Sequence, residues 1–124
     1  MRIRPERVAQ MIRREIADIL EHRLRDPRLG SLISVTDVEV TRDLSLARVY
    51  VSVLDDEPAR ERVLAILASA SGFVRRELTP RLGLREIPEI RFLLDTSIDR
   101  GARVEDLLRR LNQGEAIPDD EERA

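Results

Sequence analysis

Apolar side chains occupy every second position in one short stretch of the chain: Ala47, Val49, Val51 and Val53. Successive side chains of a β-strand point to opposite faces, so this alternation predicts a half-buried strand at 47–54. A second β-rich run, SVTDVEV, lies just before it and is joined to it by the polar TRDLS, which indicates an antiparallel hairpin. The strand must belong to a sheet with one face on the core and one in solvent.

The first strand of this hairpin, at 34–40, does not keep a single phase. Its apolar residues before position 36 share one parity and those after position 37 share the other. A flat strand would expose half of them, so we expect a β-bulge near Thr36 and Asp37.

Two helical patterns flank the hairpin. Before it, apolar residues at spacings of three and four predict a helix at about 4–24, with Pro5 in its first turn. After it, Asp55, Asp56, Glu57 and Pro58 are typical of a helix start. A long apolar stripe follows: Val63, Leu67, Ala70, Val74, Leu78 and Leu82.

That stripe crosses the triplet Ala70-Ser71-Gly72. Glycine inside a helix costs roughly 1 kcal/mol relative to alanine, so a kink or a helix-turn-helix at the triplet is expected rather than one straight rod. Pro80 is expected to disturb the second half again. A third strand is predicted at 89–95 and a short helix at 103–111.

The remaining residues, 113–124, are acidic and aperiodic, and we expect a disordered tail. Residues 1–112 are then one domain of the α+β class. Because the tail holds five acids and one Arg, the body carries 21 Arg against 19 acids, whereas the whole chain has a net charge of −2.

Composition excludes several kinds of chemistry. The chain has no cysteine, so thiolate zinc sites, cysteine nucleophiles and disulfides are absent. No glycine-rich phosphate-binding motif occurs, and no metal site or cofactor is expected. His22 lacks a second histidine as partner, so we interpret it as a surface residue. With no signal-type or membrane-length apolar run, we expect a cytoplasmic protein that does not contact membranes.

The arginines are the informative residues. Those that attract attention are Arg2, Arg4, Arg7, Arg14, Arg75, Arg76 and Arg81. Each alone is explained by a solvated surface, but a helix N-terminus after the kink would favour phosphate beside Arg75 and Arg76. The three aromatic residues are too few for rows of stacked bases.

The chain resembles the ribosome-binding factor A family over about residues 4–112. The resemblance is carried by these segments, in the right order and spacing: RPERVAQMIRREIADIL (4–20), RDPRLG (25–30), VTDVEVTRDLSLARVYVSVL (35–54), ASGFVRREL (70–78) and PEIRFLLDTSIDRG (88–101). It implies a type II KH-like fold, α-β-β-α(kinked)-β with a three-stranded sheet, in which an Ala-x-Gly kink replaces the GXXG loop of nucleic-acid-binding KH domains.

The resemblance also implies a function. The family binds the free small (30S) ribosomal subunit and its 16S ribosomal RNA, assists late maturation and 5′-end processing of that RNA, and supports growth in the cold. No catalysis or small-molecule substrate is implied, and we expect a monomer. The implied RNA-binding residues are Arg4, Arg7, Arg14, Ala70, Ser71, Gly72, Arg75, Arg76 and Arg81.

Two other classes of function stay open. A protein–protein adaptor would dock a partner without RNA, and its binding would survive nuclease and high salt. An enzyme is motivated only by the abundant carboxylates, and it would require a pocket with paired acids of perturbed pKa.

Overall fold

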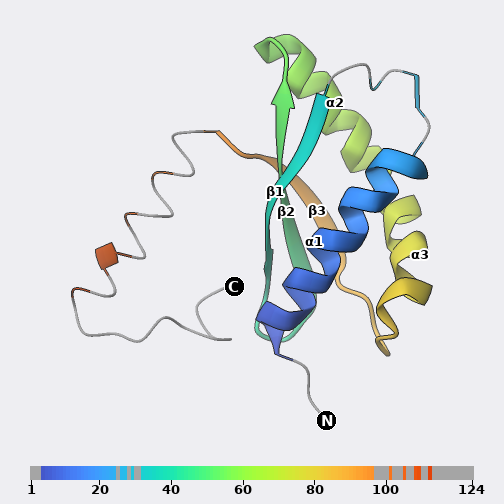
Figure 1. The fold of residues 1–124 in the computed structure, drawn as a ribbon, viewed down its shortest axis with the longest axis vertical. Helices are drawn as coiled ribbons and strands as arrows, with labels where there is room; N and C mark the ends of the chain where they lie inside the picture. The colour runs from blue at the N-terminus through green and yellow to red at the C-terminus, as the bar shows by residue number, and fades with distance from the viewer. Residues whose placement is uncertain are drawn as a thin grey trace.

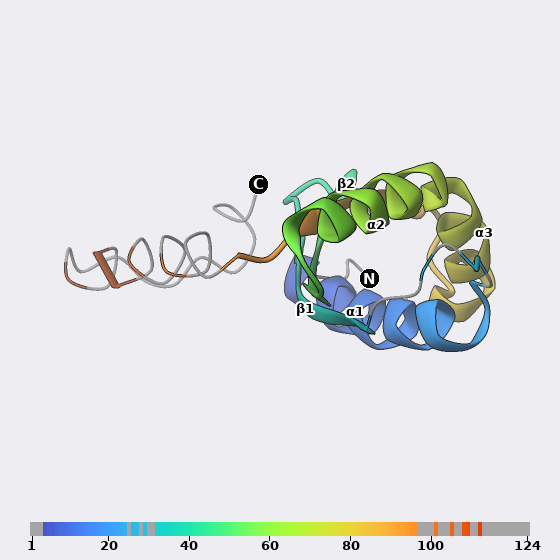
Figure 2. The ribbon, with the colours of Figure 1, turned by 90° about the horizontal axis from the view of Figure 1, so that it is seen from above.

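The computed structural model describes residues 4–24, 26–27, 29 and 32–96, together with positions 101, 105, 108, 109 and 112. Its elements are α1 (Pro5–His22), β1 (Leu32–Val40), β2 (Leu46–Leu54), α2 (Glu57–Ser69), α3 (Ser71–Leu82) and β3 (Glu89–Leu94). The strands form one mixed sheet in the order β1-β2-β3, with β1 antiparallel and β3 parallel to β2. Figures 1 and 2 show the three helices on one face of this sheet. The predicted α+β class and order of elements are confirmed.

Helix α1 begins one residue after the predicted start and ends two residues before the predicted end. Arg4 is extended and Pro5 occupies the first turn, where its missing N–H costs no hydrogen bond. The helix ends at His22, and the N–H of Arg23 donates to the carbonyl of Ile19 at 2.8 Å. Its apolar stripe is buried against the sheet: Val8, Ile12, Ile16 and Ile19.

The predicted bulge is present in β1. Val35 pairs with Val51 and Asp37 pairs with Tyr50, so Thr36 is the extra residue. The Thr36 hydroxyl donates to the Asp95 carboxylate at 2.5 Å, which joins the bulge to the residue that follows β3. Because the bulge changes the phase of the strand, both apolar pairs of β1 face the helices.

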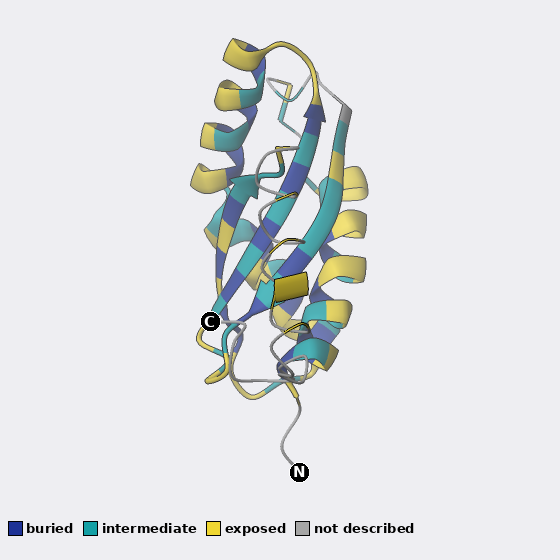
Figure 3. Ribbon diagram, turned by 90° about the vertical axis from the view of Figure 1, so that its left-hand side faces the viewer, coloured by how far each residue is buried: buried dark blue, intermediate teal, exposed yellow. Residues whose placement is uncertain are grey.

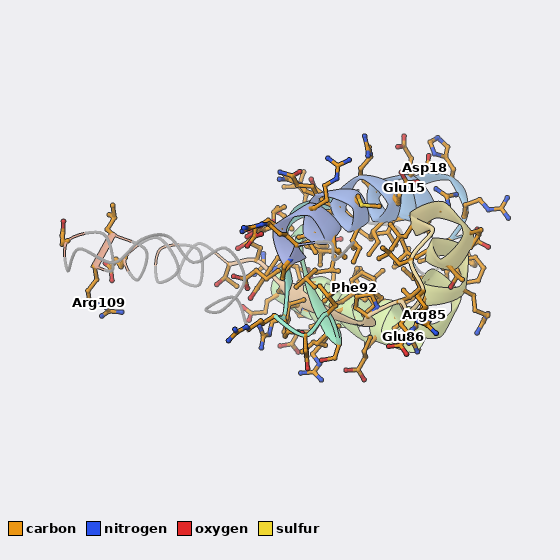
Figure 4. The ribbon with its side chains drawn as sticks, turned by 90° about the horizontal axis from the view of Figure 1, so that it is seen from below. Glu15, Asp18, Arg85, Glu86, Phe92 and Arg109 are labelled. Carbon is orange, nitrogen blue, oxygen red and sulfur yellow. The ribbon has the colours of Figure 1, made fainter. Side chains whose placement is uncertain are left out.

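Burial alternates along β2 as predicted. Ala47, Val49, Val51 and Val53 are buried, and the residues between them are half-buried on the other face. That other face of the sheet is not covered by α1, α2 or α3, and Figure 3 shows the alternation as stripes across it. The core therefore lies between the sheet and the helical layer, and Phe92 fills its interior (Figure 4).

The predicted kink is present within the triplet, and the break falls at its first residue, Ala70. Helix α2 ends at Ser69, α3 begins at Ser71, and Ala70 between them has φ −91° and ψ 1°. The N–H of Ala70 donates to the carbonyl of Ile66, which completes the last turn of α2. The carbonyl of Ala70 accepts a hydrogen bond from the N–H of Val74, in the first turn of α3. Gly72 lies in the first helical turn of α3, so the break does not come from the flexibility of glycine.

The second half of α3 is continuous. Pro80 lies inside the helix without ending it, contrary to the expected disturbance there. The helix ends at Gly83, whose φ of 64° is the left-handed conformation that glycine adopts without strain. The loop that follows leads into β3, where Ile90 and Phe92 are buried.

The end of the chain is described only in part. Of the helix predicted at 103–111, positions 105, 108 and 109 are described, and all three are helical and exposed. The other positions of that helix and the tail at 113–124 lie outside the described residues.

Candidate nucleic-acid interface

The kink presents small residues at the surface. Ala70 and Ser71 are half-buried and Gly72 is exposed. A Cβ atom built on Gly72 would meet only the Arg76 Nη1 atom, at the ordinary contact distance of 3.5 Å. Internal packing among the described residues therefore does not require glycine here, and its absence of a side chain leaves the first turn of α3 open to a close approach from outside.

Arg75 and Arg76 follow on α3 but have different surroundings. Arg75 donates two hydrogen bonds to the carbonyl of Ile87, from Nε at 3.2 Å and from Nη2 at 2.7 Å. Arg76 is exposed and makes no hydrogen bond or ion pair with the described part of the chain. One guanidinium is thus held by the backbone of the next loop, while the other is available to a ligand.

Both arginines line an open groove of about 1200 Å³ between α3, the loop after it and the β1–β2 hairpin turn. Its lining residues are Asp43, Leu44, Ser45, Gly72, Arg75, Arg76, Thr79, Gly83, Leu84, Arg85, Glu86 and Ile87. The groove therefore joins the kink to two segments that are distant in the sequence.

Arg85 is a groove residue that the sequence pattern did not single out. It is exposed and makes no hydrogen bond or ion pair with the residues described. Figure 4 places Arg85 and Glu86 side by side, away from Glu15 and Asp18 of α1. The negative charge of Glu86 cancels that of Arg85 when charges are summed along the sequence. The sequence signal that could have singled out Arg85 is its position two residues after Gly83, the glycine that ends a helix.

Arg81 lies on the other side of α3, against α1. Its Nη1 atom is 2.6 Å from Asp18 Oδ2 and 3.3 Å from Glu15 Oε1. The hydrogen bond from Arg81 lowers the pKa of Asp18, and His22 lowers it further. The same seam holds a 2.9 Å ion pair between Arg23 and Glu77. Arg81 is therefore occupied in joining two helices.

The arginines of α1 are separate from the groove. Arg4, Arg7 and Arg14 are exposed, and none of them lines it. Arg14 lies 3.7 Å from Glu15, a weak surface pair. The nine predicted site residues thus fall into three places: the kink with Arg75 and Arg76, the α1–α3 seam with Arg81, and the outer surface of α1.

Two acids at helix ends, Asp56 and Asp18, make local hydrogen bonds. Asp56 caps α2 by accepting a hydrogen bond from the N–H of Ala59 at 2.9 Å, as the helix-start pattern predicts. His22 is exposed and lies 2.9 Å from Asp18.

Among the residues described, no three His, Asp or Glu side chains gather as a metal site. None of the helices in that part of the chain is long and apolar enough to span a membrane.

Comparison with known proteins gives a consistent result. The model of the ribosome-binding factor A family matches residues 4–108. A ribosome-binding factor A from Desulforamulus reducens is 44% identical over 93% of this chain and 95% of its own length. One from Acetivibrio thermocellus is 48% identical over 94% of this chain and 98% of its own length.

Comparison of three-dimensional structures gives the same family as comparison of sequences. The crystal structure of ribosome-binding factor A from Thermus thermophilus is 29% identical, with a TM-score of 0.63 over 73% of this chain and 94% of that one. A homology model of the Thermus thermophilus factor, fitted into the cryo-EM map of a 30S complex of that factor, is 29% identical, with a TM-score of 0.53 over 73% of this chain and 89% of that one. On the family match and the level of identity, this chain belongs to the ribosome-binding factor A family.

Proposed function

We propose that this chain binds the free 30S ribosomal subunit, contacts phosphates of 16S ribosomal RNA with the kink and the adjoining groove, and assists late maturation of that RNA without catalysing a reaction. Family membership and the relative fitted into a 30S complex support the choice of partner. The single observation that carries the contact surface is Arg76, exposed and unpaired among the described residues, beside a bare glycine turn.

The physical argument for RNA rests on charge and shape. Guanidinium groups form paired hydrogen bonds with phosphate, and release of counterions from RNA supplies affinity that needs no base readout. The groove, at about 1200 Å³, is larger than the pockets of about 300–1,000 Å³ that hold small molecules. A polymer backbone fits it better than a compact metabolite does.

A binding role agrees with the carboxylates whose pKa is shifted. The pKa values of Asp18 and Asp43 are lowered by hydrogen bonds within a helix seam and a turn. General acid catalysis requires the opposite shift, a carboxyl whose pKa is raised toward neutrality. The hydrogen bonds of Asp18 and Asp43 therefore give both carboxylates a structural role. In our proposal the protein assists RNA maturation by holding the RNA in position. This is the role expected of a KH-like RNA-binding domain at 1–112.

The wider setting is part of the same proposal. The factor acts as a monomer in the cytoplasm, where small subunits mature, and its effect extends to processing at the 5′ end of 16S RNA and to growth in the cold. The acidic segment at 113–124 has no assigned part in binding.

Sedimentation of cell extract on a density gradient tests the proposal. We expect the protein to migrate with free 30S subunits, and cells that lack it to accumulate unprocessed 16S precursor. Binding that persists after nuclease treatment and at high salt would instead favour the adaptor function. Failure to migrate with the small subunit would contradict the proposal as a whole.

A further inference from the structure

The groove is built by two walls that internal hydrogen bonds hold in place. On one side, Arg75 of α3 donates from Nε and Nη2 to the carbonyl of Ile87, at 3.2 and 2.7 Å. Ile87 is itself buried. A forked pair of bonds to a buried residue fixes the end of the 83–87 loop against the helix, and Arg85 belongs to that loop.

On the other side, the β1–β2 turn is fixed by Asp43. Its Oδ1 atom accepts from the Ser45 hydroxyl at 2.7 Å, the Thr41 hydroxyl at 2.9 Å and the Ser45 N–H at 3.1 Å. The carbonyl of Ser45 in turn accepts from the N–H of Glu89 at 2.9 Å, which ties the turn to the start of β3. Walls fixed before binding lower the entropy cost of binding.

The lining identifies the chemistry of the ligand. The groove is lined by three arginines and two acids, Asp43 and Glu86, so its lining has a small excess of positive charge. No aromatic residue lines the groove, so base stacking is not available along it. Recognition would then depend on charge and on the spacing of phosphates rather than on base identity. This is the chemistry of a sugar–phosphate backbone.

We propose that a strand of ribosomal RNA passes through this groove with its phosphates on Arg76 and Arg85, and that Arg75 is a positioning residue that holds the loop carrying Arg85. This deepens the proposed function, on which it rests, by naming Arg85 as a contact and by giving adjacent arginines different roles.

A double-mutant cycle on binding to free 30S subunits tests the division of roles. Arg76→Ala and Arg85→Ala should each weaken binding roughly tenfold and reduce the slope of log affinity against log salt by about one. Arg75→Met should weaken binding in the wild-type background but cause little further loss in Arg85→Ala, because its effect acts through that residue. Arg75→Met and Arg76→Ala should instead multiply their effects.

The outcomes separate the alternatives. A full further loss on adding Arg75→Met to Arg85→Ala would show that Arg75 contacts RNA itself. A normal salt slope in Arg85→Ala would remove that residue from the phosphate path. If the wild-type chain fails to bind 30S subunits at all, the proposed function fails before this inference is reached.

Two further variants control for charge and folding. Arg62→Ala, on the exposed surface of α2 and outside the groove, should leave affinity and slope unchanged. Glu86→Gln, which removes a negative charge from the lining, should tighten binding about two- to threefold, and weaker binding would contradict a phosphate ligand. Thermal unfolding of each variant shows whether the affinities compare folded proteins.

Discussion

The two long sides of α3 carry arginines in contrasting environments. On the side that packs against α1, Arg81 bridges Glu15 and Asp18, and Arg23, the residue after α1, pairs with Glu77. On the groove side, Arg76 has no partner among the described residues and Arg75 binds only a backbone carbonyl. Arginines therefore join two helices on one side of α3, whereas on the other side the charge of Arg76 is not paired within the described residues. Our proposed interface rests on this difference in pairing and not on the number of arginines.

The largest effect is expected from reversing charge on the groove side. Arg76→Glu should weaken 30S binding roughly a hundredfold, because it removes a phosphate contact and adds repulsion. Arg62→Glu on α2 makes the same change of charge outside the groove and should alter affinity only a few-fold. Equal losses from the two variants, measured by co-sedimentation at one salt concentration, would mean that general charge governs binding.

The kink gives the next largest effect. Gly72→Val should weaken binding roughly tenfold if RNA approaches the bare turn closely, because a branched side chain fills that space. Gly72→Ala should raise the free energy of unfolding by a few tenths to about 1 kcal/mol, because its Cβ meets only Arg76 and alanine favours helix. Wild-type binding by a folded Gly72→Val protein would make the kink a purely structural feature.

The seam should respond in stability rather than in binding. Arg81→Met removes the partner of two carboxylates and should lower the thermal unfolding midpoint slightly, because half-buried ion pairs that still contact solvent contribute little. For comparison, Leu78→Ala leaves a cavity at a buried position of the same helix and should lower the free energy of unfolding by about 2–5 kcal/mol. The 30S affinity of folded Arg81→Met should stay within about twofold of wild type, and a large loss would place Arg81 in the interface.

The smallest effect concerns pH. Because the pKa of folded Asp18 lies below its ordinary value of 3.8, the folded state holds fewer protons there than the unfolded state. The stabilisation is present above pH 3.8 and is lost as the pH falls through the lower, folded pKa. The thermal unfolding midpoint of the wild-type protein should therefore fall more steeply with decreasing pH than that of Arg81→Met. Parallel plots of midpoint against pH would show that the Arg81–Asp18 ion pair does not contribute to stability.

Sequence patterns predicted the order of the elements, but they did not show which arginines form ion pairs. The apolar residues of β1 change from one parity to the other across Thr36, and a β-bulge brings both sets to the same face. The structure has this bulge. The kink was placed correctly but assigned to the wrong cause, because propensities describe Gly72 and not the way Ala70 serves both helices. Which arginine is paired depends on helices meeting across more than sixty residues, as in Arg81 with Asp18, and no local pattern contains that.

The position of Arg85 in the groove also could not be predicted from a local sequence pattern. Its loop has no periodicity, and Glu86 cancels its charge in any sum along the chain. Only the return of the chain toward α3, held by Arg75 on Ile87, places this loop beside the kink.

The salt dependence of 30S binding, compared between Arg76→Ala and Arg81→Ala, tests the contrast between the two sides of α3 most directly. The slope of log affinity against log salt should fall by about one in Arg76→Ala and stay at the wild-type value in Arg81→Ala. An unchanged slope in Arg76→Ala, or an equal fall in Arg81→Ala, would contradict the account.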